Sequence, residues 1–209
     1  MDALFLHGWA FSSKMFSALE GIKPDLPGHG KNKDKYRDFE KLAEDIALRL
    51  PAKHRVVGWS LGGSLALMLA LKFPTKVKEL VLIGTSPFFG GAWDERNLRA
   101  FKLRVKKEGV TFFRKLAFPK PFEDTVELSV CLRILEDYIR LDLRNALPYL
   151  KSRVFIIHGE NDSVVPVEDA FKLHTLIKGS KLIILPGGHF PFEDERSLLS
   201  TVFKVRSNL

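Results

Sequence analysis

The sequence predicts an α/β fold, with a mainly parallel sheet of about six strands flanked by helices. Short apolar segments of strand character alternate along the chain with longer amphipathic segments of helical periodicity. Polar, glycine-rich turns follow several of the apolar segments. The length of 209 residues, with 45% hydrophobic and 28% charged residues, suits one compact globular protein and not a disordered or fibrous one.

The predicted strands are the short apolar runs, which lie near residues 3–6, 22–25, 54–58, 79–84, 153–158 and 181–185. Such runs are typical of strands buried on both faces of a sheet. Amphipathic periodicity predicts the core helices near residues 10–18, 38–50, 61–72, 167–177 and 192–205. This alternation favours a sheet covered by helices on both faces.

The alternation of strands and helices stops between Ser86 and Tyr149, where the chain has helical character over 93–107, 110–117 and 123–141. We therefore expect a single domain spanning residues 1–209. Its core comprises 1–86 and 149–209, and a helical insertion occupies about 87–148.

Several classes of protein are disfavoured by the composition. No apolar run reaches the roughly 18 residues that a membrane helix needs. The first residues enter a strand without the basic and apolar regions of a signal peptide, so we expect a cytoplasmic protein that does not associate with membranes. The single cysteine, Cys131, lies in an apolar helical setting that favours core packing. We expect a monomer.

A G-x-S-x-G pentapeptide stands between a β-branched strand and an Ala/Leu-rich helix, at Gly58-Trp59-Ser60-Leu61-Gly62. A turn this sharp strains the backbone of Ser60 and needs neighbours without side chains. The helix directs its amides and positive dipole end at the serine hydroxyl, so an oxyanion there would meet the N–H of Leu61. The alternative interpretation is an ordinary glycine-rich turn. The flanking strand and helix favour a nucleophile.

A serine nucleophile requires a base and a group that orients the base. Asp162 follows the strand near 153–158, and His189 follows the strand near 181–185. Parallel sheets place their ligands at this carboxyl edge. Asp169 and Asp194 could in principle replace Asp162, but neither follows a strand. The chain order Ser60, Asp162, His189 is that of α/β-hydrolases and differs from the chymotrypsin and subtilisin orders.

Five signatures in this order resemble the α/β-hydrolase superfamily over nearly the whole chain: His7-Gly8-Trp9, the motif DLPGHG at 25–30, GWSLGG at 58–63, HGENDSVVP at 158–166, and Gly188-His189. Within the superfamily the chain most resembles the pimeloyl-acyl-carrier-protein methyl ester esterases of biotin synthesis, partly through Asp142-Leu143-Arg144. The resemblance implies that the insertion at 87–148 is a helical cap. The antiparallel strand pair with which the family usually begins is lacking here.

The resemblance implies a serine carboxylesterase. His189 would take the proton of Ser60 while Asp162 orients the imidazole. The backbone amides of Trp9 and Leu61 would form the oxyanion hole. The chemistry needs neither a metal nor an organic cofactor, and the sequence shows no metal-ligand cluster.

Aromatic and aliphatic side chains near the motifs are candidates to bind the acyl chain: Trp9, Trp59, Phe88, Phe89, Phe113 and Leu116. Trp9 and Trp59 are chosen because they adjoin the oxyanion loop and the nucleophile. The other four are chosen by position in the insertion alone. For each, core packing is the alternative interpretation.

The formal net charge is +8, and nine basic residues against one acid, Glu108, lie between residues 96 and 120. Such a run is often only a solvated helix face. A basic protein also invites a nucleic-acid interpretation, but no nucleic-acid motif appears. The resemblance offers a third reading, in which an acidic acyl carrier protein docks on Arg96, Arg99, Lys102, Arg104, Arg114 and Lys115.

Two other function classes stay open. One is a serine hydrolase of different substrate, such as a short-acyl esterase, a thioesterase or a carbon–carbon bond hydrolase. The other is a non-catalytic binding protein of the same fold. A dehalogenase is disfavoured because the pentapeptide carries serine where that chemistry uses aspartate.

Overall fold

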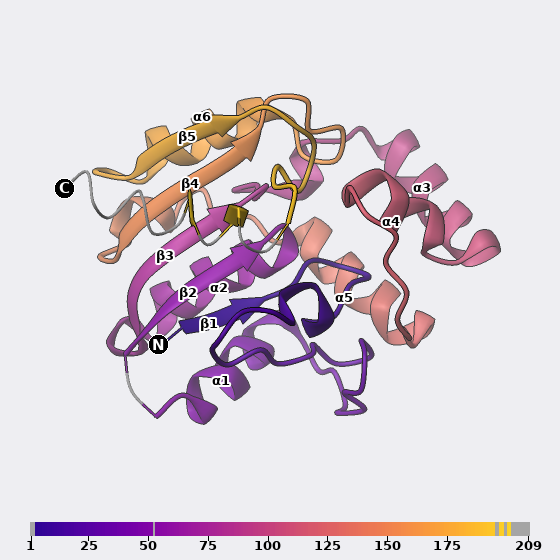
Figure 1. The fold of residues 1–209 in the computed structure, drawn as a ribbon, viewed down its shortest axis with the longest axis horizontal. Helices are drawn as coiled ribbons and strands as arrows, with labels where there is room; N and C mark the ends of the chain where they lie inside the picture. The colour runs from indigo at the N-terminus through magenta and orange to yellow at the C-terminus, as the bar shows by residue number, and fades with distance from the viewer. Residues whose placement is uncertain (1–2, 52, 195–196, 199, 202–209) are drawn as a thin grey trace.

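The structure is a computed structural model that describes residues 3–51, 53–194, 197–198 and 200–201. Within these residues five strands form one sheet in the order β1-β2-β3-β4-β5, with every neighbouring pair parallel (Figure 1). The strands are β1 (Ala3–Leu6), β2 (His54–Trp59), β3 (Val77–Ile83), β4 (Arg153–Gly159) and β5 (Lys181–Leu185). The predicted parallel α/β architecture is confirmed.

The strand predicted at 22–25 is wrong, and the sheet has five strands instead of about six. Only Ile22 pairs with β1: its N–H donates to Ala3 O at 2.9 Å and its carbonyl accepts from Phe5 N at 2.9 Å. Pro24 has no N–H, so pairing cannot continue along this segment. The chain leaves the sheet edge and turns toward the DLPGHG motif.

Three core helices lie on one side of the sheet and agree with the prediction: α1 (Phe39–Arg49), α2 (Leu61–Lys72) and α6 (Val167–Leu176). Figure 1 shows α2 and α6 behind the strands. α2 is buried from Leu61 to Ala70 and packs on β2 and β3. Because it is apolar all round, α2 can form only inside the core.

The helix predicted at 10–18 is a single 3-10 turn, η1 (Ser13–Phe16). Ala10 has a φ of 67°, and Ser12 is extended and accepts a hydrogen bond from Lys14 N, so no helix can begin before Ser13. Of the helix predicted at 192–205, residues 197–198 and 200–201 are helical, and most of the rest lies outside the described residues.

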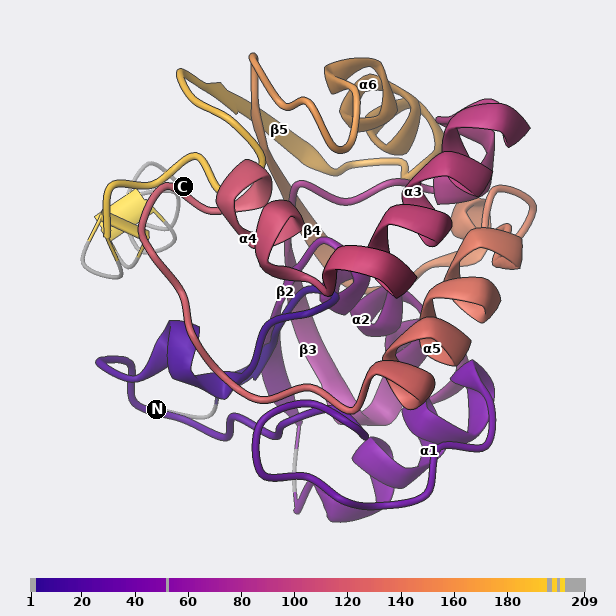
Figure 2. The same ribbon diagram turned by 90° about the vertical axis from the view of Figure 1, so that its right-hand side faces the viewer.

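Residues 87–148, here named the cap segment, connect β3 to β4 and contain α3 (Glu95–Glu108), α4 (Thr111–Ala117) and α5 (Leu128–Arg140). The Asp94 side chain caps α3 by accepting from Asn97 N, and Gly109, with a φ of 74°, ends it. Figures 1 and 2 show the three helices together, beyond the carboxyl ends of the strands. Short 3-10 turns are η2 (Pro74–Lys76), η3 (Phe89–Gly91) and η4 (Leu147–Tyr149).

Among the helices of the described residues, none combines the length and apolar character needed to cross a bilayer.

Candidate active site

Ser60 occupies a strained turn between β2 and α2. Its φ is 56° and its ψ is −123°, a conformation that costs on the order of 1–3 kcal/mol for a residue with a side chain. The neighbouring glycines leave no space for larger residues: a Cβ on Gly62 would lie 2.2 Å from Leu6 O, and one on Gly58 would lie 2.4 Å from Gly62 O. The close approach of β1, β2 and α2 therefore requires glycine on both sides of the serine.

The surroundings of Ser60 keep it at the N-terminus of α2, where it is 4% exposed. Its N–H donates to Ile83 O at 2.8 Å, which ties the turn to the end of β3, and its carbonyl accepts from Gly63 N at 2.9 Å. The first turn of α2 contains no acidic residue. The positive end of the helix dipole thus faces the serine without a competing negative charge.

Asp162 lies in the turn that follows β4 and is surrounded by hydrogen-bond donors. Its Oδ1 accepts from the backbone N–H groups of Val164, at 2.8 Å, and Val165, at 2.9 Å. Its Oδ2 lies 2.7 Å from His189 Nδ1. Burial alone would raise the pKa of Asp162, but the charge of His189 and the hydrogen bonds outweigh it and hold the pKa well below its usual range.

A second imidazole also contacts this carboxylate. His158 Nε2 lies 3.2 Å from Asp162 Oδ2 and 2.9 Å from Val165 O, and both side chains are fully buried. Sequence analysis did not single out His158. Its spacing of four residues from Asp162, across the turn that follows β4, was the available signal.

His189 is 1% exposed, and its Nε2 is buried without a hydrogen-bond partner among the described residues. The indole of Trp59 donates to His189 O at 2.9 Å. A Cβ on Gly84 would lie 3.0 Å from His189 Nδ1, so the imidazole packs directly against the backbone after β3. Since Gly84 follows Ile83, whose carbonyl accepts from Ser60 N, His189 and Ser60 both lie at the carboxyl end of β3.

The predicted oxyanion loop lies against the serine. A Cβ on Gly8 would be 3.3 Å from Ser60 Cβ. Phe11 N donates to Gly8 O at 3.2 Å, so residues 8–11 form a turn with Trp9 and Ala10 at its centre. The indole Nε1 of Trp9 donates to Cys131 O of α5 at 2.8 Å. The loop between β1 and η1 is thus attached to the cap segment.

His7 and His29 support this loop as neutral side chains. His7 Nε2 accepts from Leu26 N at 2.9 Å, and His29 Nε2 accepts from Ala10 N at 3.2 Å. Burial lowers the pKa of His7 to about 4 and that of His29 to about 3. Both therefore stay uncharged near neutral pH and organise the backbone.

Comparison with known proteins identifies the family of this chain. Residues 3–199 match the family described as the alpha/beta hydrolase family. The chain belongs to the α/β hydrolase family. A pimeloyl-[acyl-carrier protein] methyl ester esterase of Pseudoalteromonas atlantica is 33% identical over 90% of this chain and 87% of the relative. The corresponding esterase of Nitrosomonas europaea is 30% identical over 91% of this chain and 89% of the relative.

Solved structures agree in fold. The esterase EaEST of Exiguobacterium antarcticum has a TM-score of 0.85 at 24% identity, covering 99% of this chain and 91% of that one. The hydrolase olei00960 of Oleispira antarctica has a TM-score of 0.84 at 15% identity, with the same coverage. At these identities the likeness shows that the α/β hydrolase fold is shared.

Three of the six predicted acyl-binding residues lie together in this α/β hydrolase. A small apolar pocket between the cap segment and the turn after Asp162 is lined by Phe89, Trp93, Leu98, Phe101, Phe113, Leu116 and Val164. Trp9 packs edge-on against Phe113, with ring centroids 5.1 Å apart. The pocket therefore adjoins both the oxyanion loop and the turn that contains Asp162.

The remaining two candidates lie elsewhere. Trp59 lies on the His189 side, where its ring centroid is 4.6 Å from that of Phe11 and 5.4 Å from that of Phe190. Phe11 also contacts the pocket residue Phe113, with ring centroids 6.3 Å apart. Phe88 lies beneath the guanidinium of Arg144, 4.9 Å from ring centroid to Cζ, and does not line the pocket.

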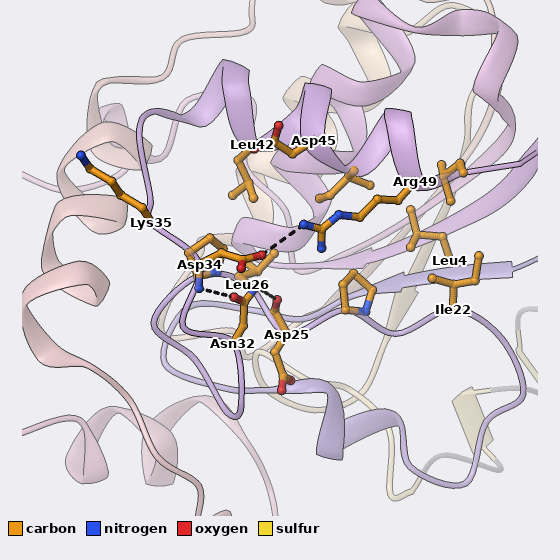
Figure 3. Close-up of a pocket in the computed structure, with 14 residues that line it drawn as sticks. Leu4, Ile22, Asp25, Leu26, Asn32, Asp34, Lys35, Leu42, Asp45 and Arg49 are labelled. Atoms are coloured by element: carbon orange, nitrogen blue, oxygen red, sulfur yellow. Dashed lines mark hydrogen bonds and ion pairs between the residues drawn. The ribbon is translucent and has the colours of Figure 1, made fainter.

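A larger pocket lies at the β1 edge of the sheet, between α1 and residues 22–35 (Figure 3). Its floor includes Leu4, Leu26 and Ile46, and the exposed ion pair of Arg49 with Asp34, at 3.1 Å, lies on its rim. None of the predicted site residues lines it.

The prediction that Arg114 belongs to an exposed docking face is wrong. Arg114 is 6% exposed and its Nε donates to Ala10 O at 2.8 Å. It shares the buried face of α4 with Val110, Phe113 and Ala117, at helical spacing. The other predicted docking residues are exposed or half-buried: Arg96, Arg99, Lys102, Arg104 and Lys115.

Tyr138 of α5 was missed by the sequence analysis. Its ring stacks on Phe89 with centroids 4.8 Å apart, and its hydroxyl is buried without a geometrically good hydrogen bond to any described residue. Burial raises the pKa of Tyr138, while the nearby hydroxyls of Ser64 and Ser60 act to lower it. Tyr138 therefore brings a polar atom of the cap segment close to Ser60.

In the described part of the chain, no group of three or more His, Cys, Asp or Glu side chains is arranged to hold a metal ion.

Proposed function

We propose that this carboxylic ester hydrolase uses Ser60 as nucleophile, His189 as general base and Asp162 as the group that orients the base. The observation that carries the proposal is the 2.7 Å contact of His189 Nδ1 with Asp162 Oδ2, at the strand end where Ser60 is held. Donation from Nδ1 to the carboxylate leaves the lone pair on Nε2. That nitrogen is buried without a described partner, so its lone pair is available to accept a proton.

The reaction proceeds in two steps, acylation of Ser60 and hydrolysis of the acyl-serine. His189 Nε2 accepts the proton of Ser60 as its oxygen attacks the ester carbonyl, and the resulting oxyanion is stabilised by the N–H groups of Trp9 and Leu61. Collapse breaks the bond to the alcohol, which takes the proton from His189 and leaves an acyl-serine. Water, deprotonated by His189, then attacks the acyl-serine. The acid is released and the Ser60 hydroxyl is regenerated.

The proposed substrate is a methyl ester of a pimeloyl chain borne by an acyl carrier protein. The names of the relatives support it, as does the apolar pocket beside the oxyanion loop. An acidic carrier would meet basic side chains on α3 and α4: Arg96, Arg99, Lys102, Arg104 and Lys115. Charge complementarity of this kind mainly accelerates and selects the encounter.

Ser60→Ala tests the catalytic assignment. We expect loss of ester hydrolysis and of labelling by a fluorophosphonate, with the melting temperature retained. Near-full activity in this variant would remove Ser60 from the mechanism. Wild-type protein that neither hydrolyses esters nor takes the fluorophosphonate would instead be a non-catalytic binding protein of this fold.

A substrate panel tests the carrier. Methyl, butyl and octanoyl esters, free and carrier-linked, are compared at low and physiological salt. We expect Arg96→Glu with Arg99→Glu to lower kcat/KM about 10-fold on the carrier-linked ester only, with the exposed Lys178→Glu as control. If free short esters are preferred and neither salt nor the charge reversal matters, the enzyme is a general short-acyl esterase.

A further inference from the structure

Ala10 is held in an unfavourable conformation beside the proposed oxyanion hole. Its φ is 67°. Among the non-glycine residues in the described part of the chain, only Ser60 also has a positive φ. It is the third residue of the turn closed by Phe11 N and Gly8 O, and a positive φ there is typical of a type II turn. Glycine is favoured at this place because a Cβ makes the conformation costly.

Two side chains hold Ala10 in place. Its N–H donates to His29 Nε2 at 3.2 Å, and its carbonyl accepts from Arg114 Nε at 2.8 Å. If the turn relaxed to a negative φ, the peptide between Trp9 and Ala10 would rotate and break the bond to His29. The strained turn therefore persists only while these contacts do.

Arg114 is an unusual residue for this task. It comes from α4, 104 positions later in the chain, and is buried with its Nη2 lacking a hydrogen-bond partner among the described residues. Asp124 and Glu123 act on it electrostatically, but neither lies within ion-pair distance. A buried guanidinium without a paired carboxylate destabilises a fold. The guanidinium instead contacts the Ala10 carbonyl and the Phe122 ring, whose centroid lies 5.4 Å from Cζ.

We propose that Arg114 is a positioning residue for catalysis, which holds the Ala10 carbonyl and so fixes the Trp9 N–H toward the reacting oxygen. This inference rests on the proposed function, in which Trp9 N–H is an oxyanion donor. It makes the oxyanion hole depend on α4, because the loop reaches its active conformation only with the cap segment in place. The effect falls on the transition state, where the oxyanion forms, and not on binding of the ester.

Arg114→Met tests the proposal, with Arg114→Lys and the exposed Lys107→Met as controls. The readouts are kcat and KM on a free short-chain ester, and the inhibition constant of a trifluoromethyl ketone, whose adduct with Ser60 places an oxyanion in the hole. For Arg114→Met we expect kcat to fall roughly 10- to 100-fold with KM within about 2-fold, and ketone affinity to fall by a similar factor. Lysine should restore most of kcat, and Lys107→Met should match wild type.

A second variant keeps the test decisive if Arg114→Met folds poorly. Ala10→Gly removes the strain, so the double variant with Arg114→Met should recover kcat to within about 5-fold of wild type. Unchanged kcat and ketone affinity in Arg114→Met, or no recovery in the double variant, would overturn the proposal. Failure of the ketone to inhibit wild type would instead overturn the oxyanion assignment itself.

Discussion

His189 Nδ1 and Asp162 Oδ2 are 2.7 Å apart although the residues belong to turns after different strands. The same oxygen also meets His158 Nε2 at 3.2 Å, and the other carboxylate oxygen accepts two backbone N–H groups. The carboxylate is thus fixed from several directions. This fixed position determines which nitrogen of His189 carries the proton.

Asp162→Asn should lower kcat on the order of 10⁴-fold while the fold is kept. An amide can donate to Nδ1, which stabilises the imidazole tautomer whose lone pair faces away from the serine. Steady-state kinetics on a free ester measure the effect, and Asp142→Asn, which affects an exposed pair with Arg144, is the matched control. A kcat within 10-fold of wild type would show that another group orients His189.

The buried histidines should make the protein acid-sensitive. The pKa of His29 is lowered by burial to about 3, against about 6.5 when unfolded, so below pH 6.5 only the unfolded state takes up a proton. The free energy of unfolding therefore falls as pH drops from about 6.5 toward 3, by up to roughly 1.4 kcal/mol per pH unit for this group. Urea unfolding between pH 7 and 4 measures this fall in the free energy of unfolding.

His29→Gln isolates this contribution, since glutamine can still accept from Ala10 N but does not titrate in this range. The pH dependence of its unfolding free energy should be flatter than that of wild type. His174→Gln, at an exposed position on α6, controls for the exchange of histidine for glutamine itself. Parallel curves for wild type and His29→Gln would contradict the assignment of acid sensitivity to His29.

Tyr138→Phe should stabilise the protein by about 1 kcal/mol. The phenylalanine ring keeps the stacking on Phe89 and removes a buried hydroxyl that lacks a good partner among the described residues. The melting temperature and chemical denaturation measure the gain, with Phe89→Leu as a control that loses the stacking. We expect kcat to change by less than about 3-fold. A larger loss would mean that the hydroxyl engages Ser60 during catalysis.

The order of motifs along the chain was sufficient to predict the parallel sheet and to place Ser60, Asp162 and His189 at its carboxyl edge. These predictions succeed because strand ends in a parallel sheet converge whatever the details of packing. The strand at 22–25 was overcounted because only Ile22 of this segment pairs with β1, and the missing N–H of Pro24 ends the pairing.

Side-chain direction in the cap segment was harder to predict. Arg114 stands in a basic run that suggests a solvated surface, although its spacing from Val110 and Ala117 puts it on the buried face of α4. The same spacing from Cys131 and Leu135 places Tyr138 on the buried face of α5. Periodicity can identify these faces, but the partner atoms depend on how the cap segment packs, which is a long-range property. The positive φ of Ala10 likewise has no signal in its residue type.

Removing one member of the buried Arg55–Glu79 pair should destabilise the protein without slowing catalysis. The two residues face each other across β2 and β3, each side chain about a tenth exposed: 11% for Arg55 and 10% for Glu79. Glu79→Gln removes the carboxylate that pairs with a buried guanidinium, and breaking such a pair typically costs about 3–5 kcal/mol. Arg55 lies near the start of β2, whereas Ser60 follows its end, roughly 16 Å away, so kcat should be unchanged.

The double variant Arg55→Met with Glu79→Leu should lose much less stability than Glu79→Gln alone, because it removes both charges of the pair together. Arg49→Met, which breaks the exposed pair with Asp34, is the control and should leave the unfolding free energy within experimental error. Equal losses in the single and double variants would show that packing around the two side chains, and not charge pairing, is what the sheet requires at this position. A fall in kcat would show that a change at the amino end of β2 alters the turn at Ser60.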